Sequence, residues 1–206
     1  MKTSLNIFSN KTLKIIGSFL IASGIILLFL IYFPLLKQEI IYQGQQVLKN
    51  KNQQETSKEI IPVDNNFGLV IPKIEVNAKV FANVDAQNPK EYLPILVKGV
   101  AQAKGSFLPG QKGNVFIFAH SSDNVFNAAR YNAVFYLLNK MEKDDEIFIY
   151  YQQQKFSYQV LGKKILNPGE MNGFLKTLKG KTLVLQTCFP PGTTLKRLLL
   201  IAKEII

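Results

Sequence analysis

Apolar residues are distributed in two different ways along the 206-residue chain. Residues 15–36 form one continuous run without a charged side chain, dominated by Ile, Leu and Phe. From about residue 67 onward, the apolar residues come in short runs separated by segments rich in Gly, Pro, Asn and Asp. The first pattern predicts a single long apolar helix, and the second is typical of successive β-strands joined by turns.

The N-terminal run predicts an uncleaved membrane anchor. Its 22 residues exceed the roughly 20 that cross the hydrocarbon core as a helix. A signal peptide has a shorter core of about 7–15 residues, and no small-x-small cleavage site follows this run. Three lysines without an acidic partner precede the run, and such a flank stays in the cytoplasm: Lys2, Lys11 and Lys14.

These features divide the chain into four predicted segments. Residues 1–14 would form a cytoplasmic tail and residues 15–36 a single-pass span of the cell membrane. Residues 37–60 are rich in Gln, Lys, Glu and Asn, which is typical of a polar linker or stalk. Residues 61–206 would then fold outside the membrane as an extracytoplasmic domain.

This domain is predicted to contain about eight short strands and few helices. Helical spacing of apolar residues is confined to residues 126–141 and 171–178, although residues 95–100 read either as a strand or as a turn of helix. Such a pattern predicts an all-β barrel or sandwich. The predicted strands are residues 69–74, 76–82, 95–100, 114–119, 147–151, 156–165, 183–188 and 197–205.

The formal net charge of +11 comes mostly from lysine. An excess of lysine suits nucleic acid, an anionic membrane surface or an anionic polymer. The chain has no basic stripe interleaved with aromatic residues, and two arginines, Arg130 and Arg197, are few for reading bases or phosphates. We therefore expect no nucleic-acid partner, and interpret the lysines as a solvated surface with weak attraction to an anionic envelope.

The single cysteine, Cys188, ends an apolar strand and is followed by a Pro-Pro-Gly turn. A lone cysteine forms no intramolecular disulfide, so it is either an inert buried thiol or a reactive one. A strand end beside a turn is where a rigid scaffold presents a functional group. This setting favours Cys188 as a nucleophile, whose thiolate would need a neighbouring base or positive charge.

Two other rare residues supply those needs. His120, the only histidine, ends the strand at residues 114–119 and could accept the thiol proton and later return it to a leaving amine. Arg197 opens the last strand, where its permanent charge could stabilise an oxyanion or position the substrate. By strand alternation Arg197 shares a face with Leu199 and Ile201. The alternative interpretations are a structural histidine and a surface ion pair.

The order His, Cys, Arg and the flanking residues resemble the sortases. These cysteine transpeptidases attach proteins to bacterial cell walls or build pili. The order differs from papain-like enzymes, where Cys precedes His, and the Ser-x-Gly-Cys pattern of L,D-transpeptidases is absent. The resemblance covers residues 70–203 and rests on three stretches: Ile71-Pro72-Lys73-Ile74, the run from Pro109-Gly110 through Gly113-Asn114 to His120, and Leu185-x-Thr187-Cys188 with its Pro-Gly loop and Arg197-Leu198-Leu199.

The chain also departs from the sortase pattern. Val184 stands where sortases usually have threonine, which affects packing more than chemistry. Residues 38–66 contain no Asp-Pro-aromatic lid of the kind found in pilin-polymerising members, so a lid-gated pilus enzyme is not expected. Some members bind calcium, but the acidic residues 144–146 read as a β-turn, and we expect no metal and no cofactor.

The resemblance implies a closed eight-stranded barrel and a specific reaction. Cys188 would attack the Thr–Gly bond of an LPXTG-like signal at the C-terminus of a surface protein, forming a thioacyl enzyme. His120 would act as acid and base, and Arg197 would stabilise the oxyanion or the substrate. An amine of a cell-wall precursor or a pilin would then release the product.

Two alternatives stay open at this stage. A cysteine peptidase on the same barrel would use water as the acceptor in place of an amine. A membrane-anchored module with an inactive site would bind the envelope without chemistry, and its thiol would be unreactive.

Overall fold

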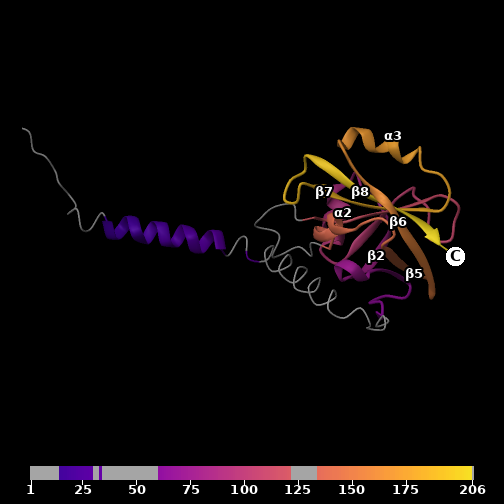
Figure 1. The fold of residues 1–206 in the computed structure, drawn as a ribbon, viewed down its shortest axis with the longest axis horizontal. Helices are drawn as coiled ribbons and strands as arrows, with labels where there is room; N and C mark the ends of the chain where they lie inside the picture. Colours follow the sequence, from indigo (N-terminus) through magenta and orange to yellow (C-terminus); the bar gives the residue numbers. More distant parts are fainter. Residues whose placement is uncertain (1–13, 30–32, 34–59, 122–133, 206) are drawn as a thin grey trace, which may run out of the picture. The chain divides into compact units, whose positions relative to one another are not determined.

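The computed structural model describes residues 14–29, 33, 60–121 and 134–205. Residues 14–29 are helical, the indigo segment in Figure 1. Within the described residues, no helix combines the length and apolar character needed to cross a bilayer. The predicted tail, most of the predicted linker and the end of the predicted span lie outside the described residues, so the anchor stays a prediction.

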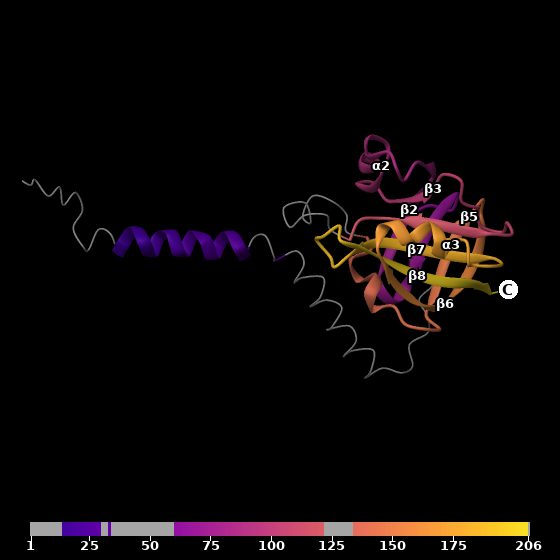
Figure 2. The ribbon, with the colours of Figure 1, turned by 90° about the horizontal axis from the view of Figure 1, so that it is seen from above.

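The rest of the described chain forms a closed barrel (Figures 1 and 2). Its strands follow the spatial order β1-β2-β3-β4-β7-β8-β6-β5, which confirms the predicted eight-stranded barrel. Closure leaves no open sheet edge. The strands are β1 (Phe67–Ile71), β2 (Val76–Val84), β3 (Val100–Ala103), β4 (Asn114–Phe118), β5 (Glu146–Tyr151), β6 (Gln154–Leu166), β7 (Thr182–Phe189) and β8 (Lys196–Ile205).

Of the two interpretations of residues 95–100, the structure supports the turn of helix at the start of this stretch, and the strand was wrong. The helix α2 (Pro89–Leu96) occupies this region, and β3 begins only at Val100. The Asn88-Pro89 pair, which reads as a turn in sequence, caps the helix: the Asn88 side chain accepts a hydrogen bond from the Lys90 N–H at 3.2 Å. Proline suits the first helical position because its fixed φ is already helical and its missing N–H would have had no partner.

Of the two other predicted helices, one is shorter than predicted and one is described only in part. Of the expected helix at residues 126–141, residues 122–133 lie outside the described part. The remainder contains the 3₁₀ helix η2 (Tyr136–Lys140). Three apolar side chains spaced three apart, which is the 3₁₀ period, are fully buried: Phe135, Leu138 and Met141. The helix predicted at residues 171–178 is α3 (Met171–Leu175), preceded by η3 (Pro168–Glu170).

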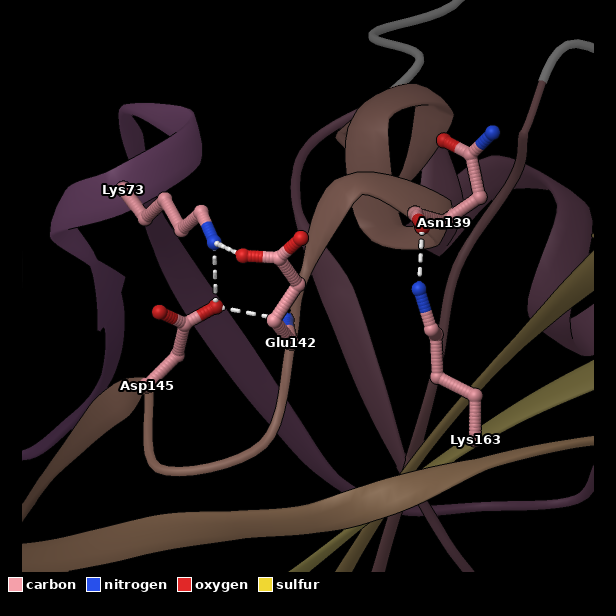
Figure 3. Close-up of polar contacts among 5 residues, drawn as sticks. All are labelled: Lys73, Asn139, Glu142, Asp145 and Lys163. Atoms are coloured by element: carbon pink, nitrogen blue, oxygen red, sulfur yellow. Dashed lines mark hydrogen bonds and ion pairs between the residues drawn. The ribbon is translucent and has the colours of Figure 1, made fainter.

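Ion pairs tie the first turn of the barrel to the turn before β5 (Figure 3). The Lys73 ammonium, in η1 (Pro72–Ile74), lies 2.8 Å from the Glu142 carboxylate and 2.9 Å from that of Asp145. Asp145 also accepts a hydrogen bond from the Glu142 N–H at 2.6 Å. The turn predicted around residues 143–146 is confirmed, and Asp145 serves there as a structural acceptor. Lys163 donates to the Asn139 carbonyl nearby.

The barrel wall is apolar on both faces where β3, β4, β7 and β8 lie side by side. One face fills the interior with Val115, Ile117, Leu183 and Leu185. The outer face carries a second cluster, against which α2 and α3 pack (Figures 1 and 2). This explains why these strands read as continuous apolar runs. The outer cluster consists of Val84, Leu96, Ala101, Ala103, Phe116, Phe118, Val184, Leu199 and Ile201.

Candidate active site

The registers of β4, β7 and β8 bring the three predicted catalytic residues to one end of the barrel wall. In the antiparallel pair β7–β8, Cys188 lies directly opposite Arg197. Directly opposed residues project from the same face of a sheet. In the parallel pair β4–β7, Phe118 lies opposite Gln186, so the chain reaches His120 at the level of Cys188.

Hydrogen bonds hold the chain before His120 against β7. The Ala119 N–H donates to the Gln186 carbonyl at 3.1 Å, and the Thr187 hydroxyl donates to the Ala119 carbonyl at 3.0 Å. The carbonyl of His120 accepts a hydrogen bond from the Phe135 N–H at 3.3 Å. His120 is only 5% exposed, so its position is determined by the protein and little by solvent.

Thr187 is a positioning residue whose role sequence reasoning did not assign. Its side chain is 2% exposed and faces the barrel interior, opposite Leu198. A buried hydroxyl needs a hydrogen-bond partner, and this one joins β7 to the residue before His120. The signal in the sequence was the pair of polar residues Gln186 and Thr187 between an apolar strand and the cysteine.

Arg197 lies half-buried on the outer face of β8, together with Leu199 and Ile201, as strand alternation predicted. Its Nη1 group donates to the Thr194 carbonyl at 2.9 Å and to the Lys196 carbonyl at 3.1 Å. No carboxylate among the described residues forms an ion pair with it. A guanidinium has five N–H donors, so Nε and Nη2 are not used by these two bonds.

An open groove of about 1310 Å³ adjoins this end of the wall. Gln186 and Arg197 line its near end, and Phe116 lies further along β4. Apolar side chains from η3, α3 and the segment that follows line one side: Pro168, Met171, Leu175 and Leu178. The sequence did not identify the groove because its lining comes from segments that are distant along the chain.

Phe107 stands at the rim of this groove, with 47% of its side chain exposed. Its ring packs directly on the backbone of Gly113, where an added Cβ would overlap the ring. Gly113 also has a φ of 150°, which L side chains rarely adopt. The Gly-x-x-Gly-Asn stretch found in the sequence therefore allows a close approach at the groove rim.

The arrangement combines a nucleophile, a proton-transfer group and a fixed cation beside a groove of peptide size. A thiol can attack a carbonyl carbon, an imidazole can move the proton, and a guanidinium can stabilise the negative oxygen. These are the requirements of acyl transfer from a peptide bond. The described residues contain no cluster of His, Cys, Asp and Glu side chains that could hold a metal ion.

Relatives are found by sequence and by structure. Sortase D of Bacillus subtilis (strain 168) is 25% identical over 140 residues, which are 66% of this chain and 62% of that protein. The match thus spans less than two thirds of the relative. Sortase C1 of Streptococcus suis is 26% identical, with a TM-score of 0.54 over 68% of this chain and 72% of the other. Sortase C-1 of Actinomyces oris is 20% identical, with a TM-score of 0.57 over 81% of this chain and 98% of the other.

The model of the sortase domain matches residues 69–205, from β1 to the end of β8. This range contains the closed barrel except for the first two residues of β1, and it includes His120, Cys188 and Arg197. Since the match covers most of the chain and the fold agrees with solved sortases, the chain belongs to the sortase family.

Proposed function

We propose that the protein is a sortase transpeptidase. It cleaves an LPXTG-like sorting signal of a surface protein through a thioacyl intermediate and joins that protein to an amine of a cell-wall precursor or a pilin. The observation that carries the proposal is the register of β4, β7 and β8. Cys188 is opposite Arg197, and His120 comes to the same level on the parallel neighbour.

Acylation proceeds through a tetrahedral intermediate. Sγ of Cys188 attacks the carbonyl carbon of the threonine in the Thr–Gly bond, and His120 takes up the thiol proton. Arg197 donates a hydrogen bond to the resulting oxyanion. The C–N bond then breaks, His120 gives the proton to the departing amine, and a thioester with Cys188 is left.

Deacylation reverses the roles. The nitrogen of the acceptor amine attacks the thioester carbon, and His120 accepts the proton that this nitrogen loses. The C–S bond breaks, the new amide is released, and the Cys188 thiol is restored. No cofactor takes part, because every proton and electron pair is supplied by the two substrates and the chain.

The lining of the groove favours a peptide substrate with apolar side chains. Its apolar lining by Phe116, Met171 and Leu175 suits the Leu and Pro of a sorting signal. Two hydrogen bonds from Nη1 of Arg197 to backbone carbonyls hold the guanidinium in place. They do not involve Nε and Nη2, and these remaining donors support a contact between Arg197 and the reacting carbonyl.

We also propose that residues 15–36 anchor the enzyme in the cell membrane, with residues 1–14 in the cytoplasm, residues 37–60 as a linker and the domain at residues 61–206 outside. The uncharged apolar run supports this arrangement. Alkaline carbonate extraction should leave the full chain in the membrane, and external protease should digest the barrel in intact cells. Release by carbonate would refute the anchor.

The decisive test of the reaction uses the full chain in detergent, an internally quenched LPXTG-type peptide and triglycine as the acceptor. Product masses are compared for the native protein, Cys188→Ala and Arg197→Ala. We expect an amine-joined product from the native protein, none from Cys188→Ala, and a rate about 10²–10³-fold lower from Arg197→Ala.

The same assay separates the alternatives. Hydrolysis without the amine-joined product would identify a cysteine peptidase. No cleavage, together with a Cys188 thiol that resists an alkylating probe in the folded protein, would identify a binding module without catalytic activity.

A further inference from the structure

Of the three catalytic positions, only Arg197 lines the groove, which extends from there to residues beside the start of β7. Cys188 and Thr182, at the two ends of β7, are six residues apart, which corresponds to about 20 Å in a strand with a rise of about 3.3 Å per residue. An LPXT segment placed with its threonine at Cys188 extends only three residues, or about 10 Å, to its leucine. About half of the groove is therefore left for residues on the N-terminal side of the leucine.

Lysines line the far half of the groove. Lys112 lies two residues before the start of β4 and Lys181 one residue before the start of β7, where Asn114 and Thr182 are register partners. The Thr182 N–H donates to the Gly113 carbonyl at 3.3 Å, so the segments carrying the two lysines run side by side. Both lysines lie at the end of the wall opposite to Cys188.

Two further lysines lie at the same level. The Asn114 side chain donates to the Leu175 carbonyl at 3.1 Å, which brings Lys176 to the start of β4. Lys104 follows β3, and the antiparallel register of β3 and β4 extends it to the level of Val115. Four segments that are distant in sequence thus gather four ammonium groups at one end of the groove.

Few carboxylates balance this charge. Asp85 is the carboxylate that lines the groove, and it accepts a hydrogen bond from the Gln87 N–H at 2.8 Å. Lys181 lies 2.6 Å from Glu204. Within residues 60–121 and 134–205, the other three lysines form no ion pair. A concave site lined by one sign of charge attracts a ligand of the opposite sign.

We propose that this far end of the groove binds acidic side chains located one to three residues before the leucine of the sorting signal. The inference rests on the proposed function, in which the acyl portion of the substrate occupies the groove while the leaving group departs. The contacts would be between Asp or Glu carboxylates of the substrate and Lys104, Lys112 and Lys176. They would add specificity upstream of the five-residue signal.

The test compares matched peptides that differ only in the three residues before the leucine: Asp/Glu, their amides Asn/Gln, or Lys. The full chain in detergent is assayed for kcat/KM. Exposed ion pairs are individually weak, so we expect the acidic peptide to be preferred over the amide peptide by about five- to tenfold, mainly through KM. The lysine peptide should be the poorest substrate.

Salt and matched variants identify the cause. Raising the salt from about 0.1 M to about 1 M shortens the Debye length from about 10 Å to about 3 Å and should abolish the preference. Lys112→Gln/Lys176→Gln should also abolish it. Lys143→Gln/Lys155→Gln removes the same charge from residues that do not line the groove, and should preserve the preference.

The outcomes separate the two proposals. Cleavage of the acidic and amide peptides with equal kcat/KM would overturn this inference and leave the transpeptidase intact. A preference that survives in Lys112→Gln/Lys176→Gln, or is lost equally in the control variant, would also overturn it. Failure to cleave any peptide, with an unreactive Cys188, would overturn the proposed function itself.

Discussion

Replacing Thr187 by valine is expected to loosen the contact that holds the residue before His120 against β7. Valine keeps the shape and the branching of threonine but removes the hydroxyl that donates to the Ala119 carbonyl at 3.0 Å. Thr187 is 2% exposed and Ala119 is 5% exposed, so water cannot readily replace the lost donor. The substitution therefore tests a single hydrogen bond in an otherwise unchanged core.

The magnitude follows from the burial of both partners. A hydrogen bond of this kind contributes about 0.5–1.5 kcal/mol, and leaving a buried carbonyl without its donor costs about 1–3 kcal/mol. Combining these ranges, we expect a loss of about 1–2 kcal/mol. For a domain of this size that corresponds to a decrease in Tm of about 2–8 °C. We also expect kcat for amine transfer to fall about tenfold at nearly constant KM, since misplacing reacting groups by about 1 Å can cost as much as about 10²-fold.

Circular dichroism melting and amine-transfer kinetics measure the two effects in the same preparations. Thr177→Val is the matched control, because the Thr177 hydroxyl donates to the Phe174 carbonyl at 2.7 Å in an exposed position where water can replace it. This control should change neither Tm nor kcat appreciably. If Thr187→Val lowered Tm but left kcat at the level of the control, the hydroxyl would stabilise the barrel without positioning the site.

Three further predictions concern the barrel around the site. Lys73→Met should lower Tm by about 3 °C at pH 7. Lys73 lowers the pKa of Glu142 below its usual 4.5, so the stabilisation is present above pH 4.5, and the difference between variant and native melting curves should shrink as the pH falls below that value. Gly113→Ala should displace the Phe107 ring from the groove rim. We expect KM to rise several-fold and chemical denaturation to show a loss of about 1–3 kcal/mol of stability. An unchanged KM would show that the ring does not contact the substrate. Burial and a nearby carboxylate raise the pKa of the Tyr158 hydroxyl, so the folded state holds this proton more tightly than the unfolded state does. The stability of the native protein should therefore fall as the pH rises above 10, and it should fall more steeply than the stability of Tyr158→Phe.

The two ends of the groove have different proposed roles: the end near Cys188 serves the reaction, and the lysine-lined end serves substrate specificity. Near Cys188 the requirements of acyl transfer restrict which residues can act. About 20 Å away, the ammonium groups act only through their charge, which makes that end suited to distinguishing substrates. Salt dependence is the property that separates the two ends, because screening weakens exposed charge pairs and leaves covalent catalysis by a buried site largely unaffected.

The sequence by itself determined the class of fold and the candidate residues. Strands were predictable because runs such as residues 183–188 and 114–119 are apolar and bounded by turn residues, a local property of the chain. Cys188, His120 and Arg197 could be selected because each is rare in this chain and each stands at a strand end. The Asn88-Pro89 pair suits both a turn and a helix start. Which of the two forms depends on what the following residues pack against, and the sequence does not show this.

Only the tertiary structure decided how those residues meet. The parallel pairing of β4 with β7 joins segments about 70 residues apart, and it brings the chain before His120 to Thr187. The outer apolar cluster, the groove and its four lysines are likewise assembled from separate strands and loops. No local pattern encodes such a surface, because its geometry depends on strand register and closure of the barrel, which are properties of the whole domain.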